Sequence, residues 1–190
     1  MAAKDRVRWD TIYRETTAYP YPDPNPLLFQ YTPSVLGIER QHRALDLAAG
    51  LGQNGLWLAA QGYVVDLMDI SRVGLKRAQE KAHERGLRSV NFLQVDLDEV
   101  TLEADAYDLI CVFRFLDRRL FPQIRAAIRP GGRVIYETFN VHWAKRMPDV
   151  NRSFLLDEGE LGGTFGDWKI LRNLEAGYTS QLVAIKPDAR

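Results

Sequence analysis

The chain has 190 residues, of which 46% are hydrophobic and 26% are charged, as in an ordinary globular protein, and we expect a single domain over residues 1–190. The 25 basic and 25 acidic residues give a formal net charge of zero, which excludes an overall electrostatic attraction to nucleic acid or to an anionic membrane. A single cysteine excludes an internal disulfide, no apolar run could span a bilayer and residues 1–6 do not resemble a signal peptide, so we expect a cytoplasmic protein without a membrane partner.

The first 40 residues precede the first predicted strand, and we expect them to form a lid over the ligand site of a core at 41–190. Residues 7–14 are predicted to be a helix, whereas the alternate prolines of residues 19–26 enforce an extended chain. Aromatic side chains concentrate in this segment, namely Trp9, Tyr13 and Tyr21. These rings either line the ligand site, where they could contact a cation, or only dock the segment on the core.

Residues 43–52 read as a short buried strand followed by a glycine turn, Gly50-Leu51-Gly52. A helix is predicted to follow from Gln53 to Gln61 and to end at Gly62. Bare backbone at such a turn can approach a ligand, and the unpaired N–H groups of the helix point toward it. The sequence therefore predicts a nucleotide site at this turn.

Asp46, near the end of the strand, indicates which nucleotide binds. The spacing of Gly50, Gly52 and Gly55 also matches the dinucleotide fingerprint, but a carboxylate at Asp46 would repel a pyrophosphate laid over the turn. S-adenosylmethionine has no phosphate and presents an ammonium group and a sulfonium, which suit an acid. The alternative is that Asp46 only ties down the loop through hydrogen bonds.

Two further acids follow the next two predicted strands. Asp69 ends an apolar strand within residues 62–71 and is predicted to accept hydrogen bonds from the ribose hydroxyls. After a helix at residues 72–85 and a strand at residues 89–95, Asp96 is predicted to accept from the adenine amino group, with Leu97 against the ring. Each acid could instead have only a capping or turn role.

The second half of the chain continues to alternate strands and helices. Strands are predicted at residues 107–113 and 133–139, a helix at 120–129, a short helix at 156–161 and a closing hairpin at 168–176 and 178–186. The predicted fold is an α/β, Rossmann-like, doubly wound sheet of seven strands. It is mostly parallel, with an antiparallel strand from the C-terminal hairpin and helices on both faces.

Residues 46–59, 69–71 and 129–132 resemble the class I S-adenosylmethionine-dependent methyltransferases, and most closely the small group that includes the tellurite-resistance methyltransferases. The resemblance runs from about residue 9 to residue 186 and specifies the cofactor better than the substrate. One departure is Ala48, which stands where the motif has its first glycine and should crowd the turn without abolishing binding. The cofactor-binding residues that we expect are Asp46, Ala48, Gly50, Gly52, Asn54, Asp69, Ile70, Asp96, Leu97, Phe113, Trp9 and Tyr13.

Methyl transfer by in-line displacement requires no catalytic side chain when the acceptor is already a good nucleophile, and we expect neither a metal nor a catalytic triad. Acceptor-pocket candidates lie at the C-terminal edge of two strands of the second half: Arg114, Glu137 and His142. Arg114 could hold an anionic acceptor or pair with Asp117, Glu137 could be structurally paired, and His142 could be solvated. The expected partner is a small-molecule acceptor, and the family resemblance implies a thiol or a chalcogen oxyanion such as tellurite.

Other classes of function remain open at this stage. A nucleic-acid or protein methyltransferase is one, although no basic stripe, appended domain or Asn-Pro-Pro-Tyr-like motif is present in the sequence. A non-catalytic or dehydrogenase-type nucleotide-binding protein is the other, and Asp46 disfavours it. The oligomeric state is not indicated by the sequence.

Overall fold

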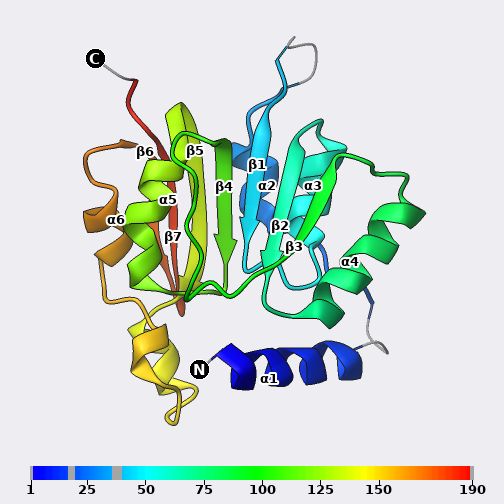
Figure 1. Ribbon diagram of the computed structural model, residues 1–190. Coiled ribbons are helices and arrows are strands. Elements are labelled where there is room, and N and C mark those ends of the chain that lie inside the picture. Colours follow the sequence, from blue (N-terminus) through cyan, green and yellow to red (C-terminus); the bar gives the residue numbers. More distant parts are fainter. Residues whose placement is uncertain (1, 17–19, 36–39, 189–190) are drawn as a thin grey trace. The chain divides into compact units, whose positions relative to one another are not determined.

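Figure 1 shows the computed structural model, which describes residues 2–16, 20–35 and 40–188. The chain forms two compact units, residues 1–101 and 102–190. Helices and strands alternate in both, as the sequence predicts. Tyr19, part of the proline-rich segment discussed above, lies outside the described residues, as do parts of the expected lid segment 1–40.

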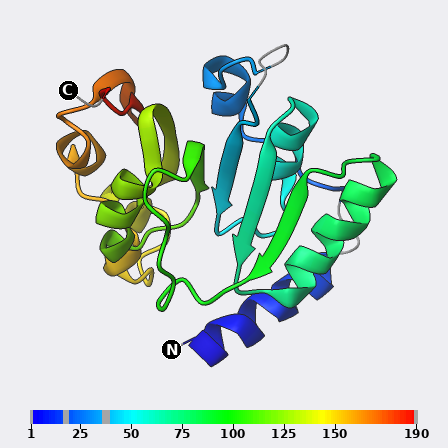
Figure 2. The same ribbon diagram turned by 45° about the horizontal axis from the view of Figure 1, so that its top comes forward.

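The first unit contains a three-stranded parallel sheet with the strand order β3-β2-β1. Both β1 and β2 are buried along nearly their whole length, as expected of parallel strands covered on both faces. Figure 2 shows α4 running alongside these strands and α1 beside α4. The elements are α1 (Ala2–Glu15), α2 (Pro26–Tyr31), β1 (Arg43–Leu47), α3 (Gln53–Ala60), β2 (Val64–Asp69), α4 (Arg72–Glu84) and β3 (Val90–Gln94).

The second unit contains the other four strands in the order β4-β5-β7-β6. Strands β4 and β5 are parallel, and β7 runs antiparallel to both of its neighbours. Edge-to-face rings, including Phe121, Tyr136 and Phe165, fill the core beside β5. The elements are β4 (Tyr107–Phe113), η2 (Arg118–Leu120), α5 (Phe121–Ala127), β5 (Ile128–Phe139), η3 (Val141–Lys145), η4 (Arg152–Phe154), α6 (Glu160–Thr164), β6 (Lys169–Ala176) and β7 (Thr179–Ile185).

These strands confirm the predicted fold class, a seven-stranded and mostly parallel sheet with an antiparallel strand from the C-terminal hairpin. The observed β4 has the predicted bounds, and β1 covers residues 43–47 as predicted. Local pattern was sufficient for these strands because each is a mostly apolar run.

Several elements differ from the sequence-based prediction. Helix α1 begins at Ala2 rather than at residue 7, and α2 was not predicted because Pro26 reads as part of the extended segment. Pro26 instead occupies the first turn of α2, behind an Asn25 cap whose side chain accepts a hydrogen bond from the Leu27 N–H. Strand β5 begins five residues early, at Ile128, because residues 131–132 pair with Lys186 after β7.

The short helix predicted at residues 156–161 lies further along the chain, at α6. Leu156 cannot be helical because it pairs with the chain after β5: its N–H donates to Phe139 and its carbonyl accepts from Val141. Helix α6 therefore starts only at Glu160. This is a case in which a long-range pairing overrides local propensity.

Candidate functional site

The glycine turn follows β1 and has an unusual backbone. Three of its residues, Ala48, Gly50 and Gly52, have positive φ angles of 57°, 57° and 74°. Gly52 also permits close packing, because a Cβ there would lie 2.9 Å from the Cβ of Ala78 and from a methyl of Leu67. Ala48 adopts the same left-handed backbone conformation although it is not glycine. The crowding expected at this position therefore appears as an unfavourable φ angle.

Gly55, in the first turn of α3, serves helix packing. A Cβ at this position would lie 2.1 Å from the Cδ2 of Leu67 and 3.1 Å from the Cβ of Asp46. Only a bare backbone lets α3 approach the strands this closely, which is the role of the third glycine in nucleotide-binding turns.

Asp46 is buried at 1% exposure, and its Oδ2 accepts a hydrogen bond of 2.8 Å from the Gly55 N–H. The carboxylate therefore joins the end of β1 to the start of α3. This contact is the loop-tying role that was the alternative for Asp46. A carboxylate has about four acceptor positions, so its predicted contact with a cofactor ammonium group is compatible with this bond and stays a prediction.

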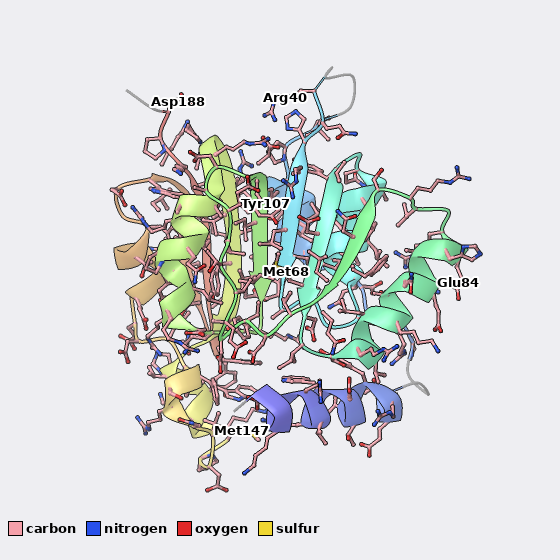
Figure 3. All side chains as sticks on the ribbon, viewed as in Figure 1. Arg40, Met68, Glu84, Tyr107, Met147 and Asp188 are labelled. Atoms are coloured by element: carbon pink, nitrogen blue, oxygen red, sulfur yellow. The ribbon has the colours of Figure 1, made fainter. Side chains whose placement is uncertain are left out.

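Asp69, the last residue of β2, is 6% exposed and holds two backbone groups at once. Its Oδ2 accepts from the Gly50 N–H at 2.7 Å, and its Oδ1 accepts from the Ser71 N–H at 2.7 Å. Burial raises the pKa of Asp69, and the two N–H donors oppose that shift. Figure 3 labels its neighbour Met68 within the side chains of β2. The ribose contact predicted for Asp69 stays a prediction.

Tyr13, from α1, lies on the glycine turn. A Cβ on Gly50 would lie 2.5 Å from the Tyr13 hydroxyl, and one on Gly74 of α4 would lie 3.0 Å from the tyrosine ring. Burial, followed by the charges of Asp69 and Asp46, raises the pKa of the Tyr13 phenol. The aromatic segment thus reaches the predicted cofactor site through Tyr13.

Trp9 stacks on Tyr13 with ring centroids 5.7 Å apart and is 37% exposed. Tyr13 lies against the glycine turn, and Trp9 stacks on the tyrosine ring. Docking of the segment on the core, one of the two roles left open for the aromatic residues, therefore occurs for Tyr13. Whether either ring meets a cofactor stays a prediction.

The proline-rich segment is tied to the same turn from another direction. The Tyr21 hydroxyl donates to the Leu51 carbonyl, and the Asn25 N–H donates to Asn54 Oδ1 at 2.8 Å. The amide oxygen of Asn54, a residue expected at the cofactor, therefore accepts a hydrogen bond from the proline-rich segment. Gln53 Oε1, beside it, is buried and has no hydrogen-bond partner among the described residues.

The third acid of the predicted set has a local role in the structure. Asp96 Oδ1 accepts from the Asp98 N–H at 3.0 Å, which is the turn role left open for it. Ile70 and Leu97, expected to line the cofactor, are half-buried after β2 and β3. Their predicted contacts with adenosine stay predictions.

Among the acceptor candidates of the second unit, Arg114 differs from ordinary surface arginines. It follows Phe113, the half-buried last residue of β4, and has a positive φ of 56°. Its N–H donates to the Glu137 carbonyl at 2.8 Å, while its exposed guanidinium has no partner among the residues described. The alternative pairing with Asp117 does not form, because Asp117 bonds to Arg119 at 2.7 Å.

The other two acceptor candidates have structural partners. Glu137 accepts a hydrogen bond from Gln181 of β7, and His142 Nε2 lies 2.8 Å from Glu158 Oε1. Structural pairing was the alternative given for Glu137. The solvated state given for His142 is wrong in part, because a glutamate 16 residues away along the chain contacts its ring.

Across residues 2–16, 20–35 and 40–188, no group of three or more His, Cys, Asp or Glu side chains is placed to hold a metal ion. Within these same ranges, no helix is both long and apolar enough to cross a membrane.

Residues 44–132 match a protein-family model described as a methyltransferase domain. The matched residues include the glycine turn, Asp46, Asp69 and β4. A curated relative, the ubiquinone/menaquinone biosynthesis C-methyltransferase UbiE of Serratia proteamaculans, is 30% identical over 122 residues. That alignment covers 58% of this chain and 48% of the relative. The chain spans about half the length of the curated relatives it matches.

Two solved structures are similar over most of the chain. One comes from a study of the conversion of a disulfide bond into a thioacetal group during echinomycin biosynthesis. It has a TM-score of 0.72 and 20% sequence identity, and the match covers 96% of this chain and 92% of that chain. TehB from Haemophilus influenzae has a TM-score of 0.70 and 17% identity and covers 94% and 67%, respectively. At these identities the likeness concerns the fold. The family-model match covers residues 44–132, and the solved structures add a likeness of fold over most of the chain.

Proposed function

We propose that this chain transfers a methyl group from S-adenosylmethionine to a small-molecule acceptor. The main observation in support of this cofactor is the arrangement around Gly50, where a left-handed glycine turn lies between the buried carboxylates of Asp46 and Asp69. Both acids keep acceptor capacity beyond the backbone bonds they already make. The donor set therefore fits a cofactor with cationic and hydroxyl groups.

When bound, S-adenosylmethionine supplies a methyl group on a positively charged sulfur. In our proposal, Asp46 would hold the cofactor ammonium group and Asp69 the ribose hydroxyls. Tyr13 would cover the turn and exclude water from it. Holding two reactants in line can contribute about 7–11 kcal/mol to lowering a barrier, so positioning alone can account for much of such a reaction.

The environment of Arg114 favours an acceptor with a negative charge. Its guanidinium is exposed and without a partner among the described residues, and its backbone is in the left-handed region, which non-glycine residues adopt at a cost. Such backbone strain is concentrated at functional sites. Asp117, the nearest candidate partner in sequence, is already neutralised by Arg119.

The class of acceptor within this proposal is a soft nucleophile that needs no general base, such as a thiol or a chalcogen oxyanion. The resemblance to tellurite-resistance methyltransferases supports tellurite as one member of that class. The relatives indicate other chemistries, since UbiE is named as a C-methyltransferase and the echinomycin protein is described with sulfur chemistry. One scaffold hosts many acceptors, so the acceptor must be found by assay.

We also propose a cytoplasmic location, supported by the single cysteine, Cys111, which is buried as a free thiol. Buried free thiols are typical of reducing compartments.

The test is a screen for formation of S-adenosylhomocysteine with thiols, tellurite, selenite, small amines, a quinol and RNA as separate acceptors. We expect turnover on at least one small molecule. For an anionic acceptor, Arg114→Ala should raise KM about tenfold or more, because a hydrogen bond to a charged group contributes about 1.5–3 kcal/mol. Arg152→Ala is the matched control, since Arg152 is also exposed and its guanidinium has no partner among the described residues. Turnover on RNA alone would contradict the proposal.

A further inference from the structure

Helix α1 is attached to α4 at one end by a carboxylate. Asp10 Oδ1 accepts from the Ser71 hydroxyl at 2.6 Å and from the Val73 N–H at 3.1 Å. Ser71 is itself the N-cap of α4, where its oxygen accepts from the Gly74 N–H at 3.1 Å. Asp10 therefore adds a second cap to the N-terminus of α4, from an element 61 residues away along the chain.

A second attachment lies one turn further along both helices. Arg77 Nη1 of α4 donates to the Tyr13 carbonyl at 2.8 Å and to the Thr16 hydroxyl at 3.2 Å. These acceptors belong to the last turn of α1 and the residue after it, where carbonyl groups have no partner within the helix. We call these two attachments, made by the side chains of Asp10 and Arg77, the latch.

Little apolar packing holds α1 in addition to the latch. Several of its side chains are exposed, including Val7 at 61% and Trp9 at 37%. None of its described side chains is fully buried. An element held mainly by polar contacts at its surface opens locally at lower free energy than a packed core element.

The latch fixes the one side chain of α1 that reaches the predicted cofactor site. Tyr13 has its own carbonyl bonded to Arg77, and Asp10 lies three residues before it on the same helix. An added Cβ on Gly50 would lie 2.5 Å from the Tyr13 hydroxyl, and one on Gly74 would lie 3.0 Å from the tyrosine ring. Movement of α1 away from α4 would therefore lift the ring from the glycine turn.

We propose that Asp10 and Arg77 are positioning residues that control cofactor exchange by latching Tyr13 over the glycine turn. With the latch closed, Tyr13 covers Gly50 and retains a bound cofactor. With the latch open, the turn is accessible, so the cofactor enters and leaves in this state. Loss of the latch increases the open population and accelerates release more than it accelerates binding.

The test compares Asp10→Ala and Arg77→Met with two controls on the same two helices, Asp5→Ala, which changes a half-buried acid, and Arg72→Met, which changes an exposed arginine. Dissociation of S-adenosylhomocysteine is followed by rapid competition, and opening of residues 2–16 by amide hydrogen exchange. We expect both latch variants to release the ligand and to exchange α1 amides at least fivefold faster than wild type. Both controls should match wild type.

A conservative variant separates hydrogen bonding from a general loss of folding. Both bonds of Asp10 go to the same oxygen, Oδ1, which an asparagine also provides. Asp10→Asn should therefore keep both rates within about twofold of wild type, while amides of β1 and β2 stay protected in every variant.

Two outcomes would overturn the inference. One is faster exchange of α1 with unchanged ligand release, which would make the latch purely structural. The other is unchanged exchange of α1 in both latch variants, which would mean that these bonds do not hold the helix. No methyl acceptor is present in these measurements, so a failed acceptor screen would count against the proposed function and leave this test standing.

Discussion

The Oδ2 of Asp69 lies 2.7 Å from the backbone nitrogen of Gly50, and this bond joins the end of β2 to the glycine turn that follows β1. One carboxylate therefore shapes the turn and also lies at the position predicted to bind the ribose. Its second oxygen caps the start of the next segment through Ser71. Substitutions of Asp69 should for this reason affect both stability and ligand binding.

Replacing Asp69 by alanine should weaken S-adenosylhomocysteine binding at least tenfold and lower the melting temperature. Binding suffers because hydrogen bonds to a charged acceptor contribute about 1.5–3 kcal/mol each. Stability suffers because the N–H groups of Gly50 and Ser71 lose their partner in a buried site. Calorimetric titration and thermal unfolding measure the two effects. The control is Asp149→Ala, which removes an exposed acid, and wild-type affinity in Asp69→Ala would show that the ribose lies elsewhere.

Ala48→Gly should stabilise the fold by about 1 kcal/mol, because the φ of 57° at this alanine costs an L-residue about that much and costs glycine little. Cofactor binding should be retained, since Gly50 and Gly52 are unchanged. Urea unfolding measures the difference. Ala60→Gly, at the end of α3, is the opposite control and should destabilise by up to about 1 kcal/mol. A less stable Ala48→Gly protein would contradict this account of the turn.

Saturating S-adenosylhomocysteine should raise the free energy of unfolding, and NAD should not. At a hundredfold excess over its dissociation constant, a ligand that binds only the native state stabilises by about 2.7 kcal/mol. Asp46 and Asp69 would repel the pyrophosphate of NAD at the glycine turn. Thermal shift with each ligand distinguishes the two cofactor classes, and stabilisation by NAD alone would reject the cofactor assignment.

The attachment of α1 should weaken in acid. Burial raises the pKa of Asp10, but the bonds from Ser71 and Val73, together with the charges of Arg14 and Arg6, outweigh this and hold the pKa below the ordinary value. A lowered folded-state pKa means that the stabilisation is present above the unfolded carboxyl pKa of about 4 and is lost as the pH falls through the lowered value. Amide exchange of residues 2–16, corrected for the intrinsic rate, should therefore accelerate below about pH 4.

Asp10→Asn identifies the group responsible for this pH dependence. The neighbouring Asp69 has a raised pKa because it is buried, so it takes up its proton at higher pH. In Asp10→Asn, the acceleration below about pH 4 should be absent, since asparagine does not titrate. The same acceleration in the variant would assign the effect to another carboxyl group.

The sequence by itself determined the local part of the site. The strand, glycine turn and helix at residues 43–60 follow from short-range preferences, since an apolar run favours a strand and only glycine adopts positive φ readily. The acids Asp46, Asp69 and Asp96 could be placed at or near strand ends for the same reason. Their hydrogen bonds to backbone groups could be named only as alternatives.

Tertiary structure alone decided which groups meet. Tyr13 reaches Gly50 and Gly74 because α1 packs on α4, and Arg77, which holds α1 there, carries no sequence signal that separates it from other helical arginines. Strand β5 starts early because residues after β7 pair with its first part. Such contacts join residues tens of positions apart, and no local preference encodes them, because their free energy arises only when packing brings the two segments together.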